Sequence, residues 1–337
     1  MSKLTNSRVL STLVSSLLIL PTVAFAADVQ ERTLKFGYST FEAHPLGQGA
    51  NKFVELVAAK SDGKIKMKVY PATQLGSETQ TISATQGGVQ DIVGTSTAPL
   101  VGLVKEYAIF DFPFLLSNEK EADALVDGPV GQTLLAKLQD KGLVGLCFFE
   151  NGFRHLTNSK RPIINGADIA GLKVRTMQNP VYIDAFKTLG ANAVPMPWPE
   201  VYTALESGAI DAQENPFGII YVNKLNEVQK YVSVTKHAYS PWAVMMSKKL
   251  WDKLSPDEQT IFVSSCNEAK AYQRQVSRAE DAKIIAELKA KGMQINELSP
   301  AEIAKIKAQM QPVIDKYAET VGADLVKQAQ ASIASTQ

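Results

Sequence analysis

The sequence predicts an α/β protein of two domains, with mixed or parallel sheets covered by helices. The first observation is length: 337 residues exceed one ordinary domain, and a hydrophobic fraction of 45% can fill two cores. The second is an alternation of short apolar strands with amphipathic helices, which is typical of sheets between helical layers. The third is a helical stretch near the C-terminus that is too long for one small domain.

The N-terminus predicts export to the periplasm. Lys3 and Arg8 precede an apolar run at 9–20, and the sequence Ala-Phe-Ala that ends at Ala26 offers small residues to a signal peptidase. We expect residues 1–26 to be a signal peptide, with cleavage after Ala26, or after Ala27 as the alternative. An apolar run of about a dozen residues is shorter than the roughly 20 that a membrane-spanning helix needs.

The charge balance argues against nucleic acid as a partner. The chain has 35 Lys and Arg against 34 Asp and Glu, and removal of Lys3 and Arg8 with the signal peptide leaves 33 against 34. A nearly neutral chain has no general excess of basic side chains for binding phosphate backbones.

The two cysteines are predicted to be free thiols. Cys147 lies in an apolar run at 143–149, and Cys266 lies in the middle of a helical stretch, so each is suited to burial as a small hydrophobic side chain. Cysteines of an exported chain also pair, and this alternative remains open.

The pattern along the chain predicts the elements in order. Strands are expected at 34–38, 65–70, 91–94, 143–149 and 171–175, and helices at 46–61, 78–87, from Pro180 with Asn179 as N-cap, and at 200–207. In such sheets ligands bind beyond the carboxyl ends of the strands, so the loops at 39–45, 95–99 and 150–154 are where we expect a site.

The longest helical signal indicates how the domains are joined. Ser255-Pro256-Asp257-Glu258 is a capping box, and neither Gly nor Pro follows until Gly292. The helix would span roughly 54 Å at 1.5 Å per residue, so we expect it to lie across both domains, with a break near Ser277 left open. Residues 299–335 are predicted to form a polar, amphipathic helical tail.

The domains are expected to cross over by several short segments. We predict one domain from residues 27–151 plus about 240–280, and a second from 152–239 plus about 281–337, with a ligand cleft between them. A hinge made of several short segments favours a clamp that closes on a ligand.

Enzyme motifs are missing from the sequence. It contains no nucleophile elbow, glycine-rich phosphate loop or Cys-x-x-Cys, and His44, His155 and His237 are widely separated without metal-ligand spacing. We therefore expect a protein that is not an enzyme and that needs no cofactor or metal.

Two arginines stand at predicted strand ends. Arg154 follows a strand and the turn Asn151-Gly152, and Arg175 ends the strand at 171–175. A guanidinium in a cleft suits a carboxylate ligand, because its planar fork donates two parallel hydrogen bonds. For either arginine, a structural ion pair with Glu150 or Asp184 is the alternative.

Motifs spread over nearly the whole chain resemble one family. They are Tyr70-Pro71, Gln74-Leu75-Gly76, Phe112-Pro113-Phe114, Gly171-Leu172-Lys173-Val174-Arg175, Leu189-Gly190-Ala191, Pro195-Met196, Glu200-Val201-Tyr202, Asp211-Ala212-Gln213-Glu214-Asn215-Pro216 and Glu227-Val228-Gln229-Lys230. In this order they resemble the solute-binding subunits of tripartite ATP-independent periplasmic (TRAP) transporters, the DctP family. The resemblance implies a two-domain periplasmic-binding-protein clamp around an organic acid, with the small and large membrane subunits as partners and a monomeric chain.

The resemblance also implies a set of site residues. Arg175 would form the two-pronged salt bridge to the ligand carboxylate, supported by Asn215 and assisted by Arg154. Other polar residues would meet hydroxyl groups: Glu78, Gln178, Asn151, Thr95 and Ser96. The loop with Ser39 and His44 would close the cleft and complete this lining, and Trp198 would supply an apolar wall unless it is ordinary core.

The ligand class follows from the same resemblance. Glu150-Asn151-Gly152 with Arg154, and His237-Ala238-Tyr239-Ser240-Pro241, are similar to binders of sugar acids such as diketogulonate and the hexuronates. The hydroxyl-capable lining suits a polyol acid, and we expect D-glucuronate or D-galacturonate. The alternatives are a C4-dicarboxylate, a keto acid or an aromatic acid, or a periplasmic sensor subunit with the same fold.

Overall fold

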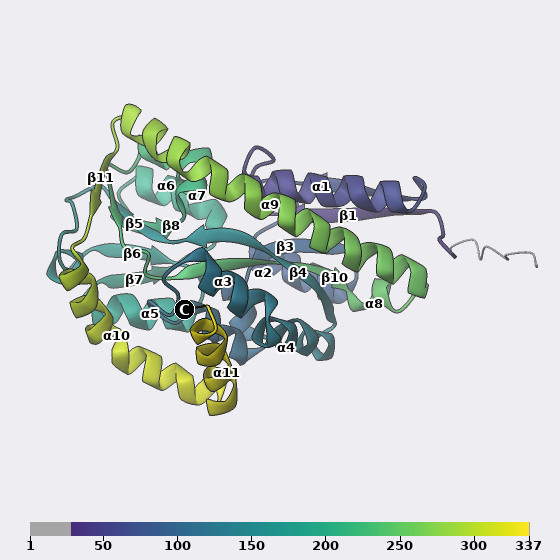
Figure 1. The fold of residues 1–337 in the computed structure, drawn as a ribbon. Helices are drawn as coiled ribbons and strands as arrows, with labels where there is room; N and C mark the ends of the chain where they lie inside the picture. The colour runs from purple at the N-terminus through teal and green to yellow at the C-terminus, as the bar shows by residue number, and fades with distance from the viewer. Residues whose placement is uncertain (1–27, 337) are drawn as a thin grey trace, which may run out of the picture.

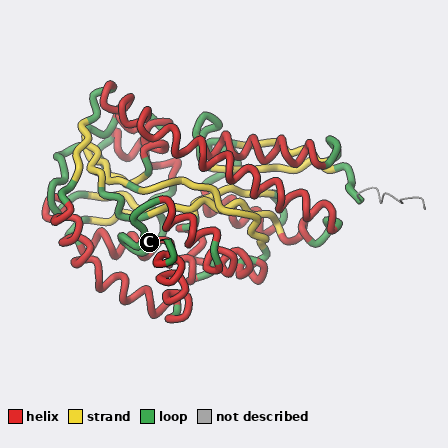
Figure 2. Tube along the Cα trace, viewed as in Figure 1, coloured by secondary structure: helices red, strands yellow, loops and turns green. Residues whose placement is uncertain are grey.

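The computed structural model describes residues 28–336, so the predicted cleavage sites at Ala26 and Ala27 lie outside the described part. The strands run through the middle of the molecule, and helices cover both faces of the sheets (Figures 1 and 2). The strands form two mixed sheets, as expected for an α/β protein, and we call them sheet A and sheet B.

Sheet A has five strands in the order β2-β1-β3-β10-β4. β1 pairs in parallel with β2 and β3, while β10 is antiparallel to β3 and β4. The bounds are β1 Arg32–Tyr38, β2 Ile65–Tyr70, β3 Ile92–Ser96, β4 Leu143–Phe153 and β10 Tyr239–Ser247.

Sheet B has six strands in the order β11-β9-β5-β8-β6-β7. β6 is parallel to β7 and β8, β9 is parallel to β11, and β5 is antiparallel to its two neighbours. The bounds are β5 His155–Asn158, β6 Lys173–Thr176, β7 Asn192–Pro195, β8 Ala212–Asn215, β9 Tyr231–Val234 and β11 Gln294–Glu297.

The helices begin where the local sequence indicates. Asn179 caps its helix by accepting a hydrogen bond from the backbone N–H of Val181, and the capping box predicted at Ser255 is formed with Glu258. The bounds are α1 Pro45–Lys60, α2 Glu78–Gly87, α3 Glu119–Asp127, α4 Pro129–Lys137, α5 Pro180–Thr188, α6 Val201–Glu206, α7 Phe217–Val222, α8 Lys248–Trp251, α9 Pro256–Ala290, α10 Pro300–Val321 and α11 Ala323–Ala334.

The long helix α9 is continuous over its 35 residues and has no break at Ser277. It packs against α1 and β4 beside sheet A and against α7 beside sheet B. Figure 1 shows it as the green helix that runs the length of the molecule. The predicted long helix across both sheets is therefore confirmed. None of the helices in residues 28–336 is apolar enough over its length to cross a membrane.

The chain passes between the sheets by short crossings. Only Arg154 separates β4 of sheet A from β5 of sheet B, and residues 235–238 connect β9 to β10. At the first crossing Gly152 has φ +111°, and the β4–β10 ladder changes register between Ser240 and Pro241. The exact domain boundaries expected from the sequence stay a prediction.

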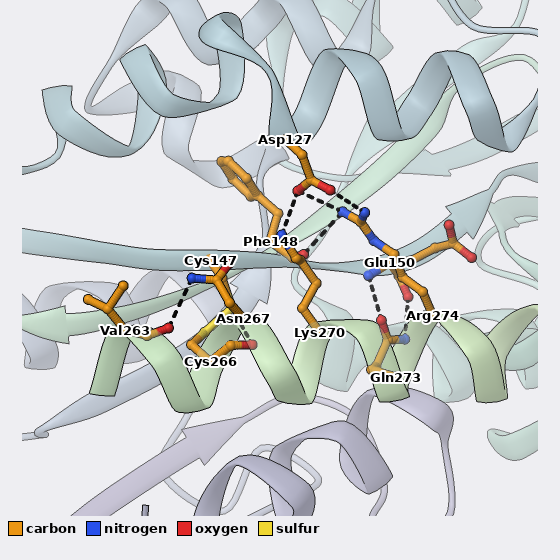
Figure 3. Close-up of a disulfide and its surroundings, with 10 residues drawn as sticks. All are labelled: Asp127, Cys147, Phe148, Glu150, Val263, Cys266, Asn267, Lys270, Gln273 and Arg274. Atoms are coloured by element: carbon orange, nitrogen blue, oxygen red, sulfur yellow. Dashed lines mark hydrogen bonds and ion pairs between the residues drawn. A yellow bond between two sulfur atoms is a disulfide. The ribbon is translucent and has the colours of Figure 1, made fainter. Parts of the chain in front are cut away.

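The expectation of free thiols is wrong, because Cys147 and Cys266 form a disulfide with a Cα–Cα distance of 5.9 Å. Cys147 lies on β4 and Cys266 on α9, and α9 packs directly over that strand (Figure 3). Each cysteine is indeed buried, but they are buried against one another. Nearby, Gln273 of α9 also joins the two elements by hydrogen bonds of 2.8 Å to both the N–H and the C=O of Glu150.

Candidate ligand-binding site

A cavity that is partly open to solvent lies between the two sheets, with an empty volume of about 410 Å³ including this open part. Its walls come largely from the carboxyl ends of parallel strands: Ser39 and Thr40 follow β1, Ser96 ends β3, Arg175 lies near the end of β6, and Asn215 ends β8. This is the edge where open α/β sheets bind ligands. Residues of both sheets therefore enclose one polar space.

Arg175 is the main cation of this cavity and is 2% exposed. Its Nε and Nη2 donate to the C=O of Met196 at 2.9 and 2.7 Å, and its Cζ lies 5.6 Å from the centre of the Trp198 ring. Within residues 28–336 no carboxylate forms an ion pair with it, and its Nη1 donates to no described residue. Burial lowers the pKa of Arg175 to about 10, so it remains charged near neutral pH but lacks a neutralising partner.

Glu78 faces the same cavity from the first residue of α2. Its Oε1 accepts hydrogen bonds from the Thr95 hydroxyl and from the Ser96 N–H, both at 3.0 Å. Its Oε2 accepts no hydrogen bond from the described residues, so it is able to accept one from a ligand hydroxyl.

Arg154 also borders the cavity, but Glu214 already neutralises it. Its Nη2 donates to Glu214 Oε1 at 2.8 Å and to the Glu214 C=O at 2.6 Å, and its Nε donates to Glu214 Oε2. His237 Nε2 lies 3.1 Å from the same carboxylate. Burial alone would raise the pKa of Glu214, but Arg154 and His237 overcome it and lower the pKa to about 2. The ion pair expected as the alternative for Arg154 exists, although its partner is neither Glu150 nor Asp184.

Two buried polar groups on the cavity wall lack partners. The Thr40 hydroxyl and the Asn151 Oδ1 are each buried and form no hydrogen bond with a described residue. Asn215 is partly satisfied, because its Nδ2 donates to Gln213 at 2.6 Å. Buried polar groups are normally paired, so these atoms indicate a ligand or water with several polar groups.

The structure brings eight of the eleven predicted site residues to the cavity: Ser39, Glu78, Ser96, Asn151, Arg154, Arg175, Trp198 and Asn215. Thr95 does not line the cavity, but its hydroxyl donates a hydrogen bond to Glu78, which does. Gln178 is exposed and does not line the cavity. His44 is buried but lines a different pocket. Whether the eight residues contact a ligand stays a prediction.

Of the apolar residues in the cavity wall, only Trp198 was predicted from the sequence. The others are Leu46, Met177, Ile219 and Trp242. Trp242 stacks on Phe149 with ring centres 5.8 Å apart, so β10 and β4 fix its orientation. Met177 follows Arg175 by two residues and was available to the same motif argument as Gln178, but sequence alone did not show which of the two faces inward.

The model for the bacterial extracellular solute-binding proteins of family 7, DctP, matches residues 36–320. The chain belongs to the DctP family of TRAP solute-binding proteins. The chain is 40% identical to the 2,3-diketo-L-gulonate-binding periplasmic protein YiaO of Escherichia coli over 80% of this chain and 82% of that protein.

Solved DctP-family structures agree with the fold. The sugar acid binding protein of Advenella mimigardefordensis, in complex with galactonate, has a TM-score of 0.90 and 39% identity, covering 92% of this chain and all of that one. A TRAP solute-binding protein of Sulfitobacter with bound β-D-galacturonate has a TM-score of 0.84 and 29% identity, covering 88% and 98%.

Family membership settles the class of activity. DctP-family proteins are periplasmic, bind small carboxylate ligands and work with the membrane subunits of TRAP transporters. The chain is therefore a solute-binding protein and not an enzyme, as the sequence predicted. Within residues 28–336 no group of His, Cys, Asp or Glu is arranged to hold a metal ion.

Proposed function

We propose that this chain captures a six-carbon sugar acid, first of all a hexuronate such as D-glucuronate or D-galacturonate, and delivers it to a TRAP membrane permease. The observation that supports this best is the buried guanidinium of Arg175, which has no carboxylate partner among the described residues. A buried charge without a partner costs several kcal/mol. A ligand carboxylate would remove that cost.

The cost of burying Arg175 without a carboxylate also links ligand binding to closure of the cavity. When the two sheets separate, water hydrates Arg175, so the open form does not need an anion. In the enclosed form the anion is needed, and it therefore binds this form with higher affinity. An anionic ligand stabilises the enclosed form for this reason.

The charges of the cavity favour a monocarboxylate with hydroxyl groups. Arg175 offers one free positive charge, whereas Arg154 is already paired with Glu214. Glu78 places a carboxylate in the same cavity, where it can accept a ligand hydroxyl but would repel a second ligand carboxylate. The unpartnered Thr40 and Asn151 groups add further sites for hydroxyls. A C4-dicarboxylate satisfies this arrangement less well.

Three of the relatives support the same ligand class, whereas a solved structure that is 33% identical to this chain holds succinate. Diketogulonate, galactonate and galacturonate, the ligands of three relatives, are all six-carbon acids with several oxygen functions. We further propose that the mature chain is exported by a cleavable signal peptide and acts as a monomer.

Calorimetric titration of two variants tests the proposal. Arg175→Ala should weaken hexuronate binding by at least about 2 kcal/mol, because it leaves the ligand carboxylate unpaired. Glu78→Gln should weaken hexuronate binding while leaving succinate binding unchanged or stronger, because it removes the repelling charge.

Lys173→Ala is the matched control for the loss of a cation, since Lys173 is an exposed residue of the same strand β6. It should bind as the wild type does. Wild-type affinity for the hexuronate in Arg175→Ala would refute the role of Arg175. Wild-type affinity for the hexuronate in Glu78→Gln would refute the contact between Glu78 and the ligand hydroxyls.

A further inference from the structure

His44 is fixed in place at the start of α1. It is 2% exposed, and its Nδ1 accepts a hydrogen bond of 3.1 Å from the Leu46 N–H, so it acts as the helix N-cap. Because Nδ1 is the acceptor, the proton of the neutral ring lies on Nε2. Burial lowers the pKa of His44 to about 3, so the ring is neutral at physiological pH.

The Nε2 edge of the His44 ring faces Gly218 of helix α7, which packs beside sheet B. Gly218 lies in α7, whose Phe217 and Ile220 belong to the core cluster beside sheet B, whereas Leu46 at the start of α1 belongs to the core cluster of sheet A. A Cβ atom added to Gly218 would lie 2.7 Å from His44 Nε2 and 3.3 Å from Cδ2. The distance to Nε2 is shorter than real Cβ contacts and the distance to Cδ2 is tighter than most of them, so a side chain at position 218 would require the His44 ring or α7 to move.

Neither partner can easily move aside. The N-cap bond and burial hold the His44 ring, and His155 packs on Phe217 beside Gly218 with ring centres 4.4 Å apart. His44, Gly218 and Ile284 of α9 border one pocket that is partly open to solvent and separate from the ligand cavity. The contact between His44 and Gly218 therefore bridges the two sides without forming part of the ligand cavity.

We propose that His44 and Gly218 are positioning residues for closure: their contact sets how far the two sides approach, and glycine at 218 is what allows the cavity to close on its ligand. This inference rests on the proposed function, because it concerns closure around that ligand. From the sequence we expected the loop with His44 to close the cleft and line it; here the lining role of His44 is replaced by a contact with Gly218 outside the ligand cavity.

The proposal predicts opposite effects of one methyl group on stability and on binding. In the open form a methyl group at position 218 contacts nothing from the other side, and alanine favours the helix over glycine. In the closed form it collides with the His44 ring. Gly218→Ala should therefore leave the unliganded protein as stable as the wild type or more stable, while weakening ligand binding about tenfold.

Calorimetry of the wild type against hexuronates, aldonates and dicarboxylates comes first and tests the proposed function alone. The variants are then titrated with an acid that the wild type binds, whatever its class, and their melting temperatures are measured without ligand. Gly87→Ala is the matched control, since Gly87 is also a helical glycine and a Cβ there has nothing within 4 Å.

A rescue variant separates the contact from general damage. In His44→Asn/Gly218→Ala the asparagine still caps α1 but is shorter, so it leaves room for the methyl group. The proposal expects weak binding in Gly218→Ala, normal binding in Gly87→Ala, and recovered binding in the double variant. Wild-type affinity in Gly218→Ala, or no recovery in the double variant, would overturn it.

Discussion

At the scale of single residues, two buried arginines have different surroundings. Arg154 donates to Glu214 from two of its nitrogens and is neutralised inside the protein, whereas Arg175 donates only to the neutral carbonyl of Met196. Since both are almost fully buried, the difference lies in the carboxylate partner and not in exposure. Arg154 therefore belongs to the structural framework of the cavity wall, and Arg175 is the cation that we propose for the ligand carboxylate.

Glu214→Gln tests this division through the pH dependence of stability. The pKa of Glu214 is lowered from 4.5 to about 2 in the folded protein, so its contribution to stability is fully present above pH 4.5 and is lost as the pH falls toward 2. The variant should lose about 3 to 5 kcal/mol of unfolding free energy at pH 7, because the charge of buried Arg154 is left without a neutralising carboxylate. Between pH 4.5 and 3 the wild type should lose more stability than the variant does.

Urea denaturation at several pH values measures both effects. Glu206→Gln, at an exposed position of α6, is the control and should follow the wild type. Parallel stability curves for wild type and Glu214→Gln between pH 4.5 and 3 would contradict the account of this ion pair.

At the scale of secondary-structure elements, the local sequence was enough to predict many helices, strands and caps. It was not enough to predict which elements contact one another. The caps at Asn179 and Ser255 and the helix α2 follow from a few neighbouring residues, and they were predicted correctly. The pairing of Arg154 with Glu214 was missed because it depends on the antiparallel β5–β8 ladder, which sets Leu156 opposite Glu214. His44 was predicted to line the ligand cavity but lines another pocket, because the sequence of a loop does not show which of its side chains face the ligand.

The disulfide is the clearest example of a contact that the local sequence does not predict. Burial of Cys147 and of Cys266 could be read separately from their flanking residues, but their pairing requires α9 to pack on β4, which joins segments 119 residues apart. A strand and a helix at such a separation carry no local signal of contact.

Replacing both cysteines by alanine should destabilise the protein without affecting the ligand cavity. A cross-link over a long loop restricts the unfolded chain, so we expect Cys147→Ala/Cys266→Ala to lose about 2 to 4 kcal/mol of unfolding free energy. Neither cysteine lines the cavity, so ligand affinity should be unchanged. A reductant should lower the melting temperature of the wild type but not that of the double variant, and an unchanged unfolding free energy would contradict this assignment.

At the scale of the whole molecule, short crossings and one long helix join two sheets around the cavity that contains Arg175 and Glu78. The crossing from Asn151 to His155 places Asn151 and Arg154 in the cavity wall, so a rotation of one sheet relative to the other would change the wall directly. The helix α9 packs beside both sheets and ties the parts together at their outer face. Such an arrangement couples the enclosure of a ligand to the relative position of the sheets.

The measurement that tests the central claim most directly is a thermal-shift screen of the mature protein against hexuronates, aldonates, dicarboxylates, keto acids and aromatic acids. A ligand that binds only the native state raises its melting temperature. We expect the largest rise with D-glucuronate or D-galacturonate, and little or none with succinate. A rise confined to dicarboxylates or aromatic acids would contradict the proposed pairing of one carboxylate with Arg175 and of hydroxyls with Glu78.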